Sequence, residues 1–386
     1  MFLKAVLTNN PELIEAASYF HKNGTIPPNT YCIDLDTVRR NAFLIREKAK
    51  EYGIELYFMT KQFGRNPLVA QAIVDSGIEK AVAVDMDEAR LLHKNHIKLG
   101  HIGHLVQIPT SQIKEALEMK PEVITCFSLD KILQINRIAE EMNMTQAILL
   151  RVIDDDRSFL YPGQEGGITL EHLEYVIEKT KRLKGVQIVG VTAFPCFLYN
   201  EQSSAIAPTA NMNVLMDAVQ ILESLGISVK QVNAPSATCV SSIPLLSSLG
   251  ATHGEPGHAL TGTTPLHALG REPENVAMVY VTEVSHRNEK EAFVFGGGFY
   301  SRSHVTCAYS PRLKRTFEAM ELPPENIDYY GSVFDPDHSL EVGDTLVYAF
   351  RTQVFVTRAK VAVLEGLQEG KPRIVGIFDS QGKEIK

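Results

Sequence analysis

Residues 123–153, VITCFSLDKILQINRIAEEMNMTQAILLRVI, contain the pattern that decides the fold. A short run rich in Val, Ile and Leu is followed by a stretch with apolar residues at helical spacing, and then by a second apolar run. The runs predict buried strands over 123–127 and 147–153, and the stretch between them predicts a helix over 129–143. Because strands joined by a helix pair in parallel, this segment is one unit of a parallel sheet.

The same alternation extends from about residue 55 to residue 260 and gives eight strand candidates in all. Eight regular units in about 200 residues favour the α/β class and a (β/α)8 barrel, with a doubly wound sheet as the alternative. The other strands are expected at 56–60, 81–85, 104–108, 186–194, 229–234 and 251–255. The other helices are expected at 67–76, 87–95, 111–119, 170–183, 213–225 and 240–249.

After Leu269 helical periodicity is mostly absent, and short apolar runs separated by turn residues predict a C-terminal β domain. Residues 30–35 predict a strand that pairs with this domain, and residues 10–22 predict a helix. The expected organisation is an N-terminal helix and strand, a barrel and a β domain, over residues 1–35, 36–269 and 270–386. The β domain should contain strands at 276–284, 292–296, 305–309, 345–350 and 355–364.

Composition narrows the class of protein. The chain has 386 residues, is 44% hydrophobic and 22% charged, and carries a formal net charge of −8, which argues against binding to a nucleic-acid backbone. Its 5 cysteines include no CxxC pair, its 12 histidines lack metal-ligand spacing, and no stretch approaches the ~18 apolar residues that span a membrane. We therefore expect a cytoplasmic protein with no metal and no membrane partner.

Three polar residues follow predicted barrel strands, at the rim where barrels place catalytic groups. Lys61 follows the first strand, Ser236 the seventh, and Glu255 ends the eighth. Separately they are compatible with a surface lysine, a helix N-cap and a turn. Together they supply what pyridoxal 5′-phosphate requires, namely an amine for the aldehyde, an anion site for the phosphate and an acid for the pyridine nitrogen.

The chain resembles the fold-type III pyridoxal-phosphate enzymes, the alanine racemase and ornithine decarboxylase superfamily, over nearly its full length. It is most similar to the ornithine-racemase-like branch and its YhfX-like members. The motifs that carry the resemblance are Thr60–Pro67, Gly190–Cys196, Pro208–Met212 and Glu255–His258. The last resembles the Glu-Pro-Gly-Arg motif of the decarboxylases, with His258 in the place of the arginine.

The resemblance implies that Lys61 forms the Schiff base and acts as a base on one face of the cofactor. It implies that Glu255 pairs with the pyridine nitrogen and that Ser236, Gly257 and His258 lie near the phosphate. Alanine racemases have arginine at the position of Glu255, and an acid there also suits decarboxylation and aldol chemistry. The resemblance further implies a homodimer in which the partner's β domain completes each site.

The acid on the opposite face of the cofactor is not identified by the resemblance. Tyr300 in the C-terminal domain and Cys196 at the end of the sixth strand are the candidates, although each is also compatible with a packing role. Asp335 is a weaker candidate and is the acid that a basic substrate would require. Arg151 at the end of the fifth strand is expected to line the pocket.

We therefore predict an amino-acid racemase or epimerase that uses pyridoxal 5′-phosphate. The alternatives are a decarboxylase and a protein that binds the cofactor without turnover. The segment 351–354 offers no metal ligands, which argues against the zinc-assisted lyases of the same superfamily.

Overall fold

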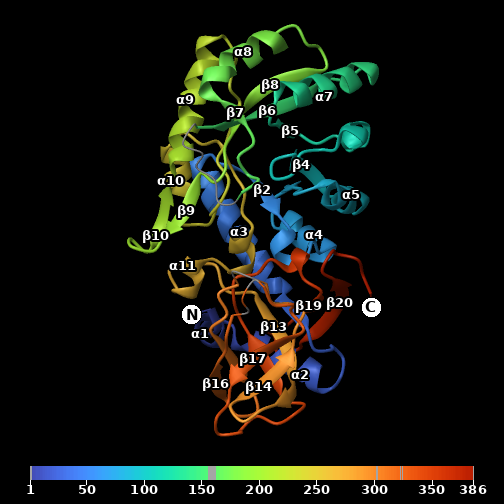
Figure 1. Ribbon diagram of the computed structural model, residues 1–386, viewed down its shortest axis with the longest axis vertical. Helices are drawn as coiled ribbons and strands as arrows, with labels where there is room; N and C mark the ends of the chain where they lie inside the picture. The colour runs from blue at the N-terminus through green and yellow to red at the C-terminus, as the bar shows by residue number, and fades with distance from the viewer. Residues whose placement is uncertain (1, 155–161, 301–302, 322, 324, 386) are drawn as a thin grey trace. The chain divides into compact units, whose positions relative to one another are not determined.

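A computed structural model describes residues 2–154, 162–300, 303–321, 323 and 325–385 (Figure 1). These residues form two compact units. The barrel unit comprises Ile45–Met59 and Gly77–Pro256. The sheet unit comprises Met1–Leu44, Thr60–Ser76 and Gly257–Lys386.

Eight parallel strands close into a ring in the barrel unit (Figure 1). Each strand pairs with the next barrel strand in the chain, including β5 with β6, and the ring closes because the last strand, β12, pairs with the first, β2. This confirms the predicted (β/α)8 barrel over a doubly wound sheet. Its strands are β2 (Glu55–Met59), β3 (Lys80–Val82), β4 (Lys98–Ile102), β5 (Val123–Cys126), β6 (Gln146–Ile153), β8 (Val186–Thr192), β11 (Gln231–Asn233) and β12 (His253–Gly254).

Buried side chains from these strands pack against one another, among them Tyr57, Val82, Val123, Leu149 and Val189. Barrel interiors are filled by side chains of this kind rather than left open. The helices that follow the strands are α5 (Met86–Lys94), α6 (Ile113–Glu118), α7 (Leu129–Glu141), α8 (Leu170–Thr180), α9 (Ala210–Ser224) and α10 (Ile243–Ser248). The unit also holds η2 (Thr110–Gln112), β7 (Ile168–Thr169) and a hairpin of β9 (Phe197–Asn200) and β10 (Ala205–Pro208).

One predicted barrel strand was wrong. The segment expected as a strand at 104–108 is a loop. The third strand of the barrel is instead β4, at Lys98–Ile102. Gly100 in β4 resembles a turn signal, but it is required because a Cβ there would lie 2.2 Å from the ring of Tyr57. A glycine inside a strand can therefore mark the close approach of a neighbouring side chain.

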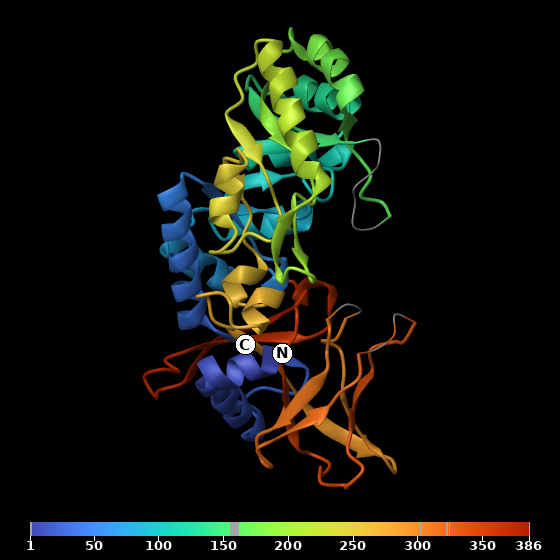
Figure 2. The ribbon, with the colours of Figure 1, turned by 90° about the vertical axis from the view of Figure 1, so that its left-hand side faces the viewer.

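The sheet unit is built around the N-terminal strand β1 (Thr30–Asp34). Figure 2 shows the C-terminal strands of this unit in orange and red. This strand pairs antiparallel with β13 (Met278–Arg287) and parallel with β19 (Lys360–Glu365), which confirms that residues 30–35 join the C-terminal sheet. The other strands are β14 (Glu291–Phe295), β15 (Cys307–Ser310), β16 (Arg315–Glu318), β17 (Tyr330–Phe334), β18 (Thr345–Tyr348) and β20 (Arg373–Asp379). Of these, β16, β17 and β20 were not predicted.

Helices α1 (Phe2–Asn9) and α2 (Pro11–Lys22) share a buried apolar cluster with β13 and β19. The expected helix over 10–22 is therefore confirmed as α2, whereas α1 was not predicted. Helix α3 (Leu35–Tyr52) runs from the sheet unit into the barrel unit. The sheet unit also contains η1 (Lys61–Phe63), α4 (Pro67–Asp75), η3 (His258–Thr261), α11 (Pro265–Ala268) and η4 (Val354–Val356). None of the helices in the described residues is long and apolar enough to cross a membrane.

Candidate active site

Glu255 lies inside the barrel unit, directly after β12, and its side chain is buried. Its Oε1 accepts hydrogen bonds from Nδ1 of His101 at 2.7 Å and from Nδ2 of Asn233 at 3.0 Å. Its Oε2 has no hydrogen-bond partner among the described residues, and Nε2 of His104 is 3.9 Å away. One oxygen of a buried carboxylate is thus left as an acceptor.

The pKa of Glu255 reflects two opposing effects. Burial alone would raise the pKa, but His104 and the hydrogen bonds from His101 and Asn233 outweigh burial and lower it to about 2. Glu255 is therefore ionised at neutral pH. A buried carboxylate with one free oxygen suits a cationic N–H group, such as a protonated pyridine nitrogen.

This pKa predicts how stability depends on pH. Because the pKa of Glu255 lies below its ordinary value of 4.5, the carboxylate stabilises the fold fully above about pH 4.5 and less as the pH falls towards 2. Glu255→Gln should lower the free energy of unfolding at pH 6 by on the order of 2 kcal/mol and should flatten its decline between about pH 4.5 and pH 2, measured by urea denaturation. Glu174→Gln, on the exposed side of α8, is the control and should change neither the free energy of unfolding nor its dependence on pH. An unchanged decline in Glu255→Gln would contradict the assignment.

Arg151 on β6 is buried in the same unit. Its Nη1 donates to the carbonyl of His104 at 3.1 Å, its Nη2 donates to the carbonyl of Gln164 at 2.9 Å, and its guanidinium lies over the ring of Phe127. Burial lowers the pKa of Arg151 to about 10. Its Nε has no hydrogen-bond partner among the described residues, so one donor is available.

Cys196 lies close enough to Glu255 and Arg151 for their charges to influence its thiol. The thiol is fully buried and donates to the carbonyl of Ala193 at 3.3 Å. Burial raises the pKa of Cys196, so this group stays protonated. The structure thus brings three of the candidate residues, Glu255, Arg151 and Cys196, together in the barrel unit.

Ser236 lies in the loop after β11, and its hydroxyl is used within the chain. It accepts from the N–H of Phe197 and donates to the carbonyl of the same residue. Ser236 and Ala237 have φ angles of 85° and 53°, a left-handed conformation that costs non-glycine residues energy and recurs in anion-binding loops. Helix α10 begins only at Ile243, so the expected helix start beside Ser236 was wrong.

Lys61 begins η1 in the sheet unit, two residues after the end of β2. Its charge acts on His258, whose pKa is lowered well below its usual range by burial and then by Arg351 and Lys61. The neutral ring of His258 contacts the hydroxyl of Thr263 through Nδ1 at 3.0 Å and accepts from Nε2 of Gln353 at 3.3 Å. Lys61 therefore lies close enough to His258 for its charge to influence the imidazole ring.

Gly257 precedes His258, and the space beside it explains the Glu-Pro-Gly sequence. A Cβ at this position would lie 2.6 Å from Nε2 of Gln62. A side chain at this position would displace the amide of Gln62, whereas glycine leaves both groups in place.

Tyr300 is also in the sheet unit, after a glycine loop that is held at two points. The N–H of Gly297 donates to Oδ2 of Asp328 at 2.8 Å, and the hydroxyl of Tyr31 donates to the carbonyl of Gly298. Nη1 of Arg351 donates to the phenolic oxygen of Tyr300 at 2.7 Å. A guanidinium at this distance stabilises a negative charge on that oxygen.

Asp335 makes its contacts within its own turn. Its Oδ1 accepts from the N–H and hydroxyl of Ser339, and its Oδ2 accepts from the N–H of Leu340. These hydrogen bonds lower the pKa of Asp335 against the effect of burial. Both oxygens cap the turn, so its geometry supports a structural role better than substrate recognition.

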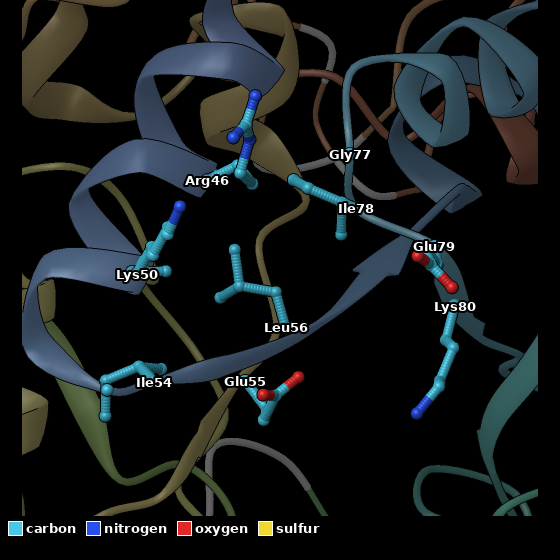
Figure 3. Close-up of a pocket in the computed structure, with 11 residues that line it drawn as sticks. Arg46, Lys50, Ile54, Glu55, Leu56, Gly77, Ile78, Glu79 and Lys80 are labelled. Carbon is cyan, nitrogen blue, oxygen red and sulfur yellow. The ribbon is translucent and has the colours of Figure 1, made fainter.

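A surface cavity of about 440 Å³ lies at the N-terminal ends of β2 and β3 (Figure 3). Arg46 and Lys50 line it from α3, and Leu56, Ile78 and Lys80 line it from the barrel (Figure 3). Barrel enzymes carry their chemistry at the opposite, C-terminal ends of the strands. We therefore do not treat this cavity as the active site. The described residues contain no group of three or more His, Cys, Asp or Glu side chains that could hold a metal ion.

Sequence reasoning missed four residues of the candidate site, namely His101, His104, Arg351 and Gln353. A signal was present for His101, because a histidine inside an apolar barrel strand needs a buried partner. It was hidden because β4 was placed six residues too late in the chain.

Comparisons with known proteins agree with this architecture. Residues 33–265 match the model of the alanine racemase N-terminal domain, and residues 279–374 match that of the YhfX-like C-terminal domain. The chain is 41% identical to YhfX of Escherichia coli (strain K12), a protein described as uncharacterised, over all of both chains.

Solved structures with the same fold belong to enzymes whose names indicate several different reactions. An alanine racemase of Clostridium difficile 630 in complex with cycloserine matches with a TM-score of 0.65 at 17% identity, over 92% of this chain and 98% of the racemase. A D-threonine aldolase from Filomicrobium marinum matches with a TM-score of 0.69 at 12% identity, over 93% and 96%. A D-threo-3-hydroxyaspartate dehydratase and a diaminopimelate decarboxylase match as well, so the fold by itself does not choose the reaction.

Proposed function

This chain belongs to the fold-type III family of pyridoxal-phosphate enzymes, with an alanine racemase N-terminal domain and a YhfX-like C-terminal domain, and from that premise we propose that it is an amino-acid racemase or epimerase. The observation that supports the cofactor in this proposal is the buried, ionised Glu255 with one free carboxylate oxygen. That oxygen is the partner that a protonated pyridine nitrogen needs.

The residues present fit pyridoxal 5′-phosphate. We assign Lys61 to the aldehyde of the cofactor and Glu255 to its pyridine nitrogen. The backbone around Ser236, Gly257 and His258 is assigned to the phosphate. Arg151 is assigned to the remaining polar edge of the cofactor ring. When bound, the cofactor supplies a protonated ring that delocalises negative charge from the Cα atom of the amino acid.

Racemisation needs a proton acceptor on one face of Cα and a donor on the other. Lys61 takes the Cα proton on its face. For the opposite face we assign Tyr300, because Arg351 stabilises the charge that the phenolic oxygen carries after it gives up its proton. Cys196 is fully buried with a raised pKa, and Asp335 caps its own turn, so both are weaker choices.

Decarboxylation is the second candidate, because an acid at the ring nitrogen stabilises negative charge at Cα whichever bond breaks. Phe194 provides apolar surface against His104, on which its ring packs edge-on, and Nε2 of His104 is 3.9 Å from the Glu255 carboxylate. Such a surface would favour loss of a carboxylate. A protein that binds the cofactor without turnover is the weaker alternative, because it would not need the sheet unit.

The substrate in this proposal is a small amino acid, and we propose a homodimer with sites shared between subunits. The test incubates the protein, reconstituted with pyridoxal phosphate, with a panel of single enantiomers in deuterium oxide. Loss of optical activity together with deuterium at Cα, in at least one amino acid, is expected. Carbon dioxide release without inversion would favour the decarboxylase, and no exchange with any member would leave binding without turnover as the best account.

A further inference from the structure

His101 connects two strands that are not neighbours in the barrel. It lies on β4, while Glu255 follows β12, and β3 and β2 separate these strands in the ring. The side chain is completely buried, and it reaches across the interior to the Glu255 carboxylate at 2.7 Å. A buried histidine facing a buried carboxylate at this distance is held by that contact rather than by solvent.

The two ring nitrogens of His101 have different partners, which fixes where the proton lies. The ionised Glu255 carboxylate can only accept, so Nδ1 carries a hydrogen and donates it. Nε2 faces the hydroxyl of Thr125 on β5, which can donate to it. The same arrangement fixes the tautomer of histidines beside metal ions, where the outer partner orients the inner group.

Both donors to Glu255 meet the same oxygen. Asn233 donates to Oε1, as His101 does, and its Nδ2 also contacts the hydroxyl of Thr192. A carboxylate held by two donors on one oxygen cannot turn freely, so Oε2 stays as the free acceptor.

We propose that His101 is a positioning residue that fixes the orientation of Glu255 and so keeps the pyridine nitrogen of the bound cofactor protonated. This rests on the proposed function, in which Glu255 pairs with that nitrogen. The other titratable groups whose charge couples to Glu255 are His104, His253, Tyr57 and Cys196, and none of them donates a hydrogen bond to it among the described residues. Of the titratable groups that the structure describes, His101 is the one that orients the carboxylate through a hydrogen bond.

The test uses the reconstituted protein with an isotope-labelled ring nitrogen in the cofactor, whose NMR chemical shift reports its protonation. His101→Leu should move the shift towards that of neutral pyridine and weaken cofactor binding by about tenfold. His101→Asn, whose amide N–H can replace Nδ1–H, should restore most of the wild-type chemical shift and most of the affinity for the cofactor. His93→Leu, on the exposed side of α5, is the matched control and should match the wild type.

A wild-type shift in His101→Leu with the cofactor bound would overturn the proposal. Because His101→Leu removes a buried polar group and can fail to fold, Thr125→Val provides a second variant that keeps the imidazole. With its outer partner gone, it should show a shift between those of the wild type and His101→Leu, and a wild-type shift would again count against the proposal.

A measurement on the cofactor-free protein separates this proposal from the proposed function. The pKa of Glu255, followed by NMR of its labelled carboxyl carbon, should rise by more than one unit in His101→Leu relative to the wild type. If the wild type fails to bind pyridoxal phosphate, the proposed function fails while a rise still supports the role of His101 in orienting and ionising Glu255. An unchanged pKa would overturn that role whatever the cofactor does.

Discussion

Lys61→Ala is expected to lower kcat for racemisation by more than about 10³-fold, because the same amine both attaches the cofactor and takes the Cα proton. Borohydride reduction of the wild-type protein with pyridoxal phosphate should leave a pyridoxyl group on the peptide that contains Lys61. Mass spectrometry of the digested protein should find no such group in the variant.

Two further variants separate chemistry from folding. Lys61→Arg keeps the positive charge beside His258 but has no amine that can react with an aldehyde, so it should be folded and equally inactive. Lys94→Ala, on the exposed end of α5, should keep full activity. Retention of more than a tenth of the activity in Lys61→Ala, or modification of a different lysine, would disprove the assignment.

Tyr300→Phe is expected to reduce inversion by about 10²- to 10⁴-fold, since the phenylalanine ring has no proton to exchange. Lys61 remains able to remove and return the proton on its own face. One enantiomer should therefore still exchange its Cα hydrogen with deuterium oxide, without inversion and at a rate near that of the wild type. Separate measurement of exchange and of inversion for each enantiomer tests this directly.

Tyr329→Phe, which changes a nearby exposed tyrosine, is the control and should behave like the wild type. If Tyr300→Phe inverts its substrate at the normal rate, Tyr300 is not the second acid, and Cys196→Ala becomes the next variant. Equal loss of exchange for both enantiomers would instead mean that Tyr300 supports the fold or substrate binding.

The sequence determined the type of fold through local patterns. Strands β2, β5, β6 and β8 begin within one residue of their predicted positions, because each is an almost continuous apolar run that precedes an amphipathic stretch. The pairing of residues 30–35 with the C-terminal sheet was also predictable from such a run. Short or polar strands escaped prediction, as β4 with its Gly100 and the four-residue β16 illustrate.

The sequence alone also predicted Lys61 and Glu255 as site residues, because alternating strands and helices bring every strand end to one rim of a barrel. Only the tertiary structure decided what surrounds Glu255. His101 lies 154 residues away in the chain and reaches it across the interior of a ring that closes through β12 and β2. Local periodicity predicts which residues are buried, but the partner of a buried polar group depends on how the closed ring aligns its strands.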